Sequence, residues 1–276
     1  MIEKRLSELV PQTGETIFEA ARYSLLSPGK RLRPLLTLAA AEDFGGDRFI
    51  ALDPACALEM VHAYSLIHDD LPCMDDDDLR RGKPTLHKVY GEGMALLAGD
   101  YLLTRSFEVI ADAEGLRSDQ KIEMIKVLSQ RAGAPGMIGG QAIDIASEGK
   151  EIDEGTLLAM HYGKTAALLT ACLEVGCLAA GGERSGQLQS IGLELGLAYQ
   201  FQDDLLNAMS TTAVLGKKVG TDAAKGKPTA VALFGIEATQ RKLKDLEQSL
   251  FQKIEQLPGK GIHLAPLIQK ILQRKW

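Results

Sequence analysis

Hydrophobic residues recur at helical spacing along most of the chain, and hardly any segment alternates apolar and polar residues one by one. Such alternation is typical of half-buried strands, so the pattern predicts an all-α fold class. Leu and Ala dominate the apolar positions, which also favours helices. The expected helices cover about residues 13–26, 31–43, 54–70, 92–112, 119–132, 136–148, 154–181, 184–209, 227–256 and 264–274.

Turn-forming residues separate these segments, and the breaks between them are short. Pro28-Gly29 ends one helix, and Asp53-Pro54 offers an N-cap followed by a proline suited to the first helical turn. No linker rich in Pro, Gly or Ser divides the sequence, and no repeat of fixed period occurs in it. We therefore expect residues 1–276 to form a single domain.

Composition narrows the range of partners. Hydrophobic residues make up 45% of the chain and charged residues 25%, which is the balance of an ordinary globular protein with a packed core. The formal net charge is -6, whereas a nucleic-acid surface needs a surplus of Lys and Arg, so we expect no nucleic-acid partner. Any anionic ligand must then be held by a local cluster of basic residues.

The longest apolar stretch predicts a buried helix rather than a membrane span. It covers about residues 165–180, is interrupted by Glu174, and is shorter than the ~20 apolar residues that a span requires. We therefore do not expect an integral membrane protein. The four cysteines form neither a C-x-x-C motif nor a paired framework, and the first residues lack an apolar signal core. A reducing, cytoplasmic location is the expectation.

A dense aspartate cluster follows the predicted helix 54–70. Six carboxylates lie within the ten residues from Asp69 to Asp78, and they repel one another strongly unless a cation neutralises them. Oxygen ligands without Cys or a His pair suit Mg²⁺ or Ca²⁺ better than Zn²⁺, and the EF-hand pattern is absent from the sequence. Because Mg²⁺ usually completes its shell with water and phosphate oxygens, the cluster indicates a phosphate-bearing ligand.

Two features distinguish this cluster from a solvated acidic loop, which is the usual meaning of a charge run. An apolar helix leads directly into it, and Arg80 and Arg81 follow with planar groups suited to phosphate oxygens. On a continuous helix Asp69 and Asp75 would point about 120° apart. Pro72 predicts a break that brings Asp75 back toward Asp69.

A second group of oxygen-bearing side chains lies in the predicted helix 184–209. Asp203 and Asn207 share one helical face at i,i+4, and Asp204 follows Asp203. This group would be weak evidence alone, because aspartate pairs on helix surfaces are common. Together with the first cluster it predicts a second set of metal or phosphate contacts.

Five segments make a family resemblance specific. GKRLRP, HDDLPCMDDDDLRRGKPT, GGQAIDIASEGK, GKTAAL and YQFQDDLLN resemble the trans-isoprenyl diphosphate synthases, especially the short-chain farnesyl and geranylgeranyl diphosphate synthases, over about Gly29 to Pro228. The resemblance implies an antiparallel helical bundle of the isoprenoid synthase type. In it the two aspartate clusters face each other across a deep central cavity, usually in a homodimer.

The resemblance also implies roles for individual residues. The expected direct Mg²⁺ ligands are Asp69, Asp75 and Asp203, with Asp70 and Asp204 supporting the metal shell. Three Mg²⁺ ions per active site are expected, with Mn²⁺ as an alternative metal. The residues that match isopentenyl diphosphate contacts are Lys30, Arg33, His62 and Arg81. Those that match the allylic diphosphate site are Arg80, Lys164, Thr165, Gln200, Lys217 and Lys227. The three ligand aspartates, Arg80 and Lys164 are expected to act in catalysis.

The implied reaction joins isopentenyl diphosphate head to tail to dimethylallyl or geranyl diphosphate. Farnesyl diphosphate is the expected product, because the aromatic Tyr64 lies five residues before Asp69. One alternative is a geranylgeranyl diphosphate synthase. Another is a non-catalytic partner subunit, because Asn207 stands where the family usually has a third aspartate. A terpene cyclase needs only one diphosphate site, and Lys30, Arg33 and His62 argue against it because they imply a second one.

Overall fold

The structure, a computed structural model, describes residues 1–209 and 228–273, and these residues are mostly helical. The predicted all-α fold class is confirmed. The first half of the chain forms α1 (Ile2–Leu9), α2 (Thr16–Leu25), α3 (Leu32–Asp43), α4 (Leu52–Asp69), a hairpin of β1 (Leu79–Arg80) and β2 (Lys83–Pro84), α5 (Leu86–Tyr90), α6 (Glu92–Asp112) and α7 (Ser118–Ala132). The second half forms α8 (Met137–Ser147), α9 (Glu154–His161), the π-helical turn η1 (Tyr162–Ala166), α10 (Ala167–Ala179), α11 (Gly186–Met209), α14 (Ala230–Phe234), α15 (Ile236–Glu255) and α16 (Leu264–Leu272).

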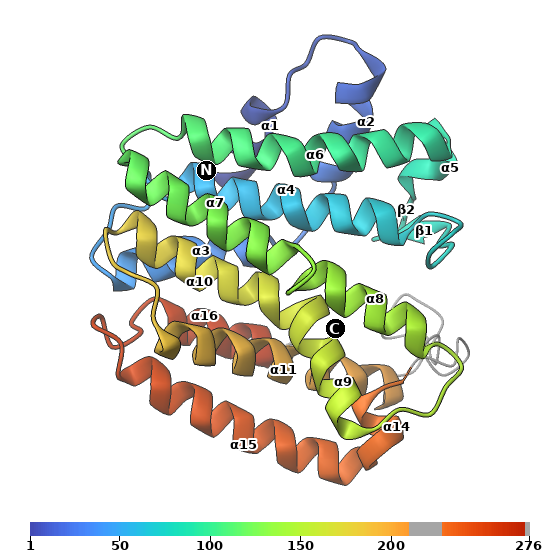
Figure 1. The fold of residues 1–276 in the computed structure, drawn as a ribbon, viewed down its shortest axis with the longest axis vertical. Coiled ribbons are helices and arrows are strands. Elements are labelled where there is room, and N and C mark those ends of the chain that lie inside the picture. The colour runs from blue at the N-terminus through green and yellow to red at the C-terminus, as the bar shows by residue number, and fades with distance from the viewer. Residues whose placement is uncertain (210–227, 274–276) are drawn as a thin grey trace.

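Helix α10 occupies the centre of the bundle. Every one of its residues is buried, and it packs against α3, α4, α7 and α11 (Figure 1). A helix that is apolar on all sides is stable only in such a place, so the predicted buried helix is confirmed. The charge that interrupts its sequence, Glu174, is neutralised by ion pairs with Arg131 and Arg184.

Helix α4 carries the first aspartate cluster at its C-terminal end. It packs between α6 and α3, and most of its side chains are buried because apolar neighbours surround it (Figure 1). Helix α11 carries the second cluster near its own C-terminal end, and the two ends point toward the same end of the bundle (Figure 1). Within the described residues, no helix is both long and apolar enough to cross a bilayer.

The structure differs from the expected helices in four places. The predicted helix 154–181 is interrupted by η1, and the predicted helix 227–256 is divided by Gly235, whose φ of 80° no regular helix contains. The other two differences are additions that the periodicity did not reveal. They are α1, which has eight residues, and the segment 79–90, which forms the hairpin and α5.

Candidate active site

The aspartate loop folds back on the end of α4. The helix stops at Asp69, and the backbone N–H of Asp75 donates a hydrogen bond of 2.8 Å to the Asp69 carbonyl. A further bond runs from the Met74 N–H to the Leu71 carbonyl. The break expected near Pro72 is therefore present, and it returns the backbone of Asp75 to Asp69.

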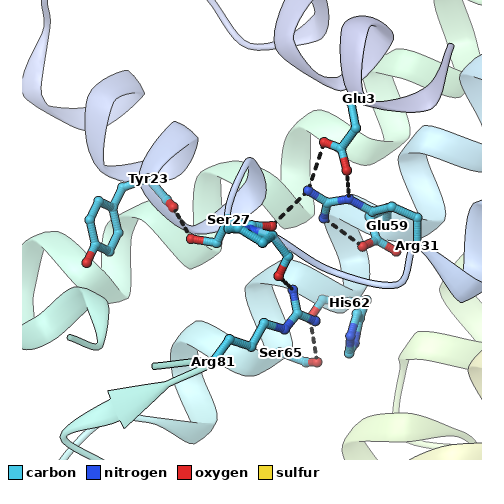
Figure 2. Close-up of polar contacts among 9 residues, drawn as sticks. Glu3, Tyr23, Ser27, Arg31, Glu59, His62, Ser65 and Arg81 are labelled. Atoms are coloured by element: carbon cyan, nitrogen blue, oxygen red, sulfur yellow. Dashed lines mark hydrogen bonds and ion pairs between the residues drawn. The ribbon is translucent and has the colours of Figure 1, made fainter. Parts of the chain in front are cut away.

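The hairpin after this loop carries two arginines, which contact different partners. Arg81 and Gly82 form its two-residue turn with φ values of 54° and 76°, the geometry that suits a tight hairpin. Arg80 donates from Nε to the Asp70 carboxylate at 2.7 Å, and its Nη2 lies 2.6 Å from the same group. Arg81 donates from Nη1 to the carbonyl of Pro28 at 3.0 Å (Figure 2). Asp70 thus orients Arg80.

A cavity of about 400 Å³ opens beside the end of α4. Asp69 and Tyr64 line it from α4, and Lys164 and Thr165 line it from η1. The rest of its wall is largely apolar, and this part comprises Met74, Met137, Ile138, Ala142 and Ile145. The cavity therefore combines a charged end with an apolar body, as a site for an amphipathic ligand requires.

Lys164 and Thr165 are placed by an unusually close helix crossing. A Cβ atom on Gly140 would lie 1.9 Å from the Lys164 backbone nitrogen, and one on Gly163 would lie 2.6 Å from the Gly140 Cα, so only glycine fits at either position. Lys164 forms an ion pair with Asp144, one turn after Gly140 on α8. The crossing and the ion pair fix the lysine at the cavity wall.

Contacts continue from η1 to the second aspartate cluster on α11. The Thr165 hydroxyl donates to the Gln200 side chain at 3.1 Å, and Gln200 donates to Asp204 at 3.0 Å. Asp204 is buried and also accepts the backbone N–H of Ala230 at 2.7 Å. Asp203 is half-buried on the same turn of α11. These contacts connect η1, which lines the cavity with Asp69, to the second cluster.

Two of the expected allylic-diphosphate residues, Lys217 and Lys227, lie outside the described residues. Among the residues that the structure does describe, no three His, Cys, Asp or Glu side chains converge as a preformed metal cage. An Mg²⁺ site does not need one, because one or two carboxylates are enough when water and phosphate oxygens supply the remaining ligands.

The electrostatics of Asp69 fit a cation-binding role. Burial raises the pKa of its carboxyl from 3.8 to about 6; Lys164 opposes this rise, and Asp75 adds to it. The ionised carboxylates are therefore held at a free-energy cost when no further cation is present. A divalent ion on their oxygens would remove that cost.

A second group of cations lies around His62 of α4. Arg33 and His62 line the main cavity, and His62 also lines a smaller one together with Arg81. Burial lowers the pKa of His62, and the nearby Arg33 and Arg81 lower it further, so the imidazole is neutral at pH 7. Arg33 Nε is buried without a hydrogen-bond partner among the described residues. Such an orphaned donor suits an anionic ligand.

The comparison with protein families decides the identification. The model of the polyprenyl synthetase family matches residues 14–259 of the chain. The chain belongs to this family. Its fold agrees with that membership, and the chain is a prenyltransferase of the family.

Relatives of this polyprenyl synthetase include two enzymes with different products. Farnesyl diphosphate synthase of Escherichia coli (strain K12) is 42% identical over 273 residues, which cover 96% of this chain and 91% of that protein. Geranylgeranyl diphosphate synthase of Cyanophora paradoxa is 40% identical over 279 residues, which cover 99% and 93%. The structure of a geranyltransferase from Helicobacter pylori, complexed with magnesium and isoprenyl diphosphate, has a TM-score of 0.87, with 33% identity and coverage of 99% and 94%.

Several residues of the polyprenyl synthetase site have partners that the sequence did not reveal. Asp144 contacts Lys164 from another helix, and the spacing of GGQAID places it one turn after Gly140, which was its only clue. Arg31, directly before α3, pairs with Glu59 of α4 beside His62, although nothing in the spacing joins them. Such long-range partners are visible only once the helices are packed.

Proposed function

We propose that the enzyme condenses isopentenyl diphosphate head to tail with dimethylallyl and geranyl diphosphate in an Mg²⁺-dependent reaction. The observation that carries this proposal is that two groups of cations line two cavities beside α4, and that these cavities share His62. Lys164 and Arg33 line the main cavity with Asp69, Arg80 and Arg81 line the smaller cavity, and His62 lines both. Two diphosphates need two such groups, whereas a single ligand needs one.

The residues present suit Mg²⁺. Asp69, Asp75 and Asp203 are the proposed ligands, and their hard oxygen atoms favour Mg²⁺, with Mn²⁺ as an alternative. Three ions per active site follow the expectation from the family. When bound, Mg²⁺ would offset the charge on the allylic diphosphate and favour its departure.

The protein's own side chains complete the allylic site. Lys164 and Arg80 are proposed to offset the charge that develops on the leaving diphosphate, and Thr165 and Gln200 to orient it. The ion pair with Asp144 fixes Lys164, and the ion pair with Asp70 fixes the plane of Arg80. Pre-oriented cations stabilise this charge without reorganising during the reaction. The lysines expected beyond α11 belong to the same proposed group.

Isopentenyl diphosphate is proposed to bind through Lys30, Arg33, His62 and Arg81. The orphaned Nε of Arg33 would donate to a phosphate oxygen, and the neutral His62 would donate one ring N–H. This arrangement holds the diphosphate of the nucleophilic substrate on its own cations. Its double bond is then directed toward the allylic carbon that loses its diphosphate.

Tyr64 supports farnesyl diphosphate as the main product. It is 5% exposed, lines the same cavity as Asp69, and packs edge-on against His68 with ring centroids 5.7 Å apart. A rigid ring at this depth would stop the chain after fifteen carbons. A C20 product, as in a geranylgeranyl diphosphate synthase, is the alternative and would require the tail to pass Tyr64.

We further infer a homodimer in a reducing cytoplasm. Leu96 and Leu97 are 46% and 54% exposed on the outer face of α6, where a second copy of the chain would cover them. The four cysteines all lie in the described part of the chain and are free thiols, which is typical of a reducing compartment. Size-exclusion chromatography with light scattering tests the dimer.

The proposed reaction is tested by incubating the purified protein with Mg²⁺, isopentenyl diphosphate and one allylic diphosphate, and analysing the products by mass spectrometry. Dimethylallyl and geranyl diphosphate should both yield a C15 diphosphate, and farnesyl diphosphate should be a poor substrate. Cyclic hydrocarbons would indicate a terpene cyclase instead. Binding of the substrates without any product would indicate a non-catalytic subunit, which is the alternative hypothesis that Asn207 favours.

A further inference from the structure

In the sequence, Arg31 lies between two residues of the proposed isopentenyl diphosphate site, but its side chain has different surroundings from theirs. The segment GKRLRP places Lys30 before it and Arg33 two positions after it. Lys30 is exposed and Arg33 is half-buried at the cavity, whereas Arg31 is only 7% exposed. Position in the sequence therefore does not explain what Arg31 does.

The guanidinium of Arg31 is held by carboxylates from two helices. Its Nε and Nη2 donate to Glu3 of α1 at 2.7 and 3.0 Å, and its Nη1 donates to Glu59 of α4 at 2.9 Å. Nη2 also donates to the Ser27 carbonyl at 3.0 Å (Figure 2). Two carboxylates more than neutralise one guanidinium, and most of its donors are in use, so Arg31 is poorly suited to bind an anion itself.

The backbone of Arg31 has an unusual conformation. Its φ of 47° and ψ of 40° are left-handed, which costs free energy for any residue with a side chain. The first turn of α3 begins directly after it, because the Leu35 N–H donates to the Arg31 carbonyl at 3.1 Å. The conformation thus sets the direction in which the chain enters α3, and with it the positions of Lys30 and Arg33.

The ion pair of Arg31 with Glu59 also lies beside His62 and Arg81, the other two residues of the proposed site. Glu59 precedes His62 by three residues, so both lie on one face of α4. Arg31, Glu59 and His62 all line the small cavity beside Arg81. Burial lowers the pKa of Arg81, and Glu59 is the foremost neighbour that opposes this fall. Glu59 therefore helps guanidinium groups to gather here.

We propose that Glu3, Arg31 and Glu59 form a positioning ion cluster for isopentenyl diphosphate. The cluster maintains the left-handed turn before α3, sets Lys30 and Arg33 against His62 and Arg81, and makes helix α1 part of the support of the site. Arg31 itself does not touch the substrate. This inference rests on the proposed function, because it assigns the cluster to one of the two proposed diphosphate sites.

The test compares Glu3→Gln with Glu8→Gln. Both variants remove one carboxylate from α1, and both residues are partly exposed, so neither change threatens folding; the ion pairs of Glu8 are with Lys4 and Arg5. Glu3→Gln should raise the KM for isopentenyl diphosphate about three- to tenfold, while kcat and the KM for geranyl diphosphate stay within about twofold of wild type. Glu8→Gln should change none of these constants.

The sign of the change separates positioning from direct binding. If Arg31 bound the diphosphate itself, releasing it from Glu3 would lower the KM for isopentenyl diphosphate, and that result would overturn the inference. Equal constants in the two variants would overturn it as well. Glu59→Gln removes the inner carboxylate and should raise the same KM further; if this buried change prevents folding, Glu3→Gln alone decides.

A binding measurement keeps this inference distinct from the proposed reaction. Isopentenyl diphosphate is titrated calorimetrically into enzyme that holds Mg²⁺ and dimethylallyl thiolodiphosphate, whose C–S bond resists ionisation. Glu3→Gln should raise the Kd by the same factor as the KM. A wild type that binds but forms no product would refute only the reaction. If the wild type is active and Glu3→Gln has an unchanged Kd for isopentenyl diphosphate, only the inference about the ion cluster is refuted. If the wild type does not bind isopentenyl diphosphate, both that inference and the proposed reaction are refuted.

Discussion

Replacing Asp69 by Asn should stabilise the metal-free protein while abolishing its activity. Burial raises the pKa of Asp69 from 3.8 to about 6. A carboxyl whose pKa is higher in the folded than in the unfolded state opposes folding when it is ionised. This penalty is absent below pH 3.8, grows as the pH rises through 6, and is constant above that. Because Asp69 is partly exposed, we expect the penalty at neutral pH to be about 1–3 kcal/mol.

The assay for Asp69→Asn is urea unfolding in the presence of EDTA. At pH 7.5 the variant should exceed wild type in unfolding free energy by about 1–3 kcal/mol, and at pH 4.5 most of this gain should disappear. Its activity with Mg²⁺ should fall by about a thousandfold, because the metal loses a charged ligand. Asp76→Asn is the matched control, since Asp76 is exposed in the same loop and asparagine tolerates its φ of 48°. A variant no more stable than wild type, or a gain that is independent of pH, would refute this account of the site.

Three further changes test separate parts of the cavity. Tyr64→Ala removes about seven heavy atoms; burying a further five-carbon unit there gains about 3 kcal/mol, so mass spectrometry should detect C20 products. Asp144→Asn removes the carboxylate partner of Lys164 and should raise the KM for geranyl diphosphate about tenfold in steady-state assays. Gly140→Ala places a Cβ 1.9 Å from the Lys164 nitrogen and should lower the unfolding free energy by about 1–3 kcal/mol in urea.

Each of these changes has a control within the chain. Tyr64→Phe keeps the ring and loses only a hydroxyl that has no partner among the described residues, so its product should stay C15. Gly93→Ala adds a Cβ in open space on a helix and should not destabilise the protein. Asp144→Asn should add nothing to Lys164→Met if it acts through the lysine. An unchanged product from folded Tyr64→Ala would contradict the first prediction. Additive effects of Asp144→Asn and Lys164→Met on the KM would contradict the second. A Gly140→Ala variant as stable as Gly93→Ala would contradict the third.

The parts of the fold that were predictable are those set by neighbours in sequence. The apolar run of α10, which contains only one charged residue, requires a buried helix whatever the rest of the chain does. Pro72 ends the helix before it, and the return of Asp75 to Asp69 follows from that local break. Two positive φ values in the Arg81-Gly82 turn were less evident, because arginine seldom marks such a turn.

The parts that were not predictable depend on contacts between distant segments. The π-helical turn η1 lies at the crossing of Gly140 and Gly163, and no local preference of the sequence YGKTA indicates it. Helix α1 has only eight residues, too few to be stable alone, and its place is set by contacts such as Glu3 with Arg31. Packing decides these features, and the motifs alone do not encode it.

The central claim is that two diphosphates meet in one cavity and react there with Mg²⁺. The most direct measurement is a single turnover in which excess enzyme is mixed with geranyl diphosphate, Mg²⁺ and radiolabelled isopentenyl diphosphate. The account predicts that the label passes into farnesyl diphosphate as an equal amount of inorganic diphosphate is released, and that neither product forms with EDTA. Consumption of geranyl diphosphate without incorporation of the label, or incorporation that persists in EDTA, would contradict it.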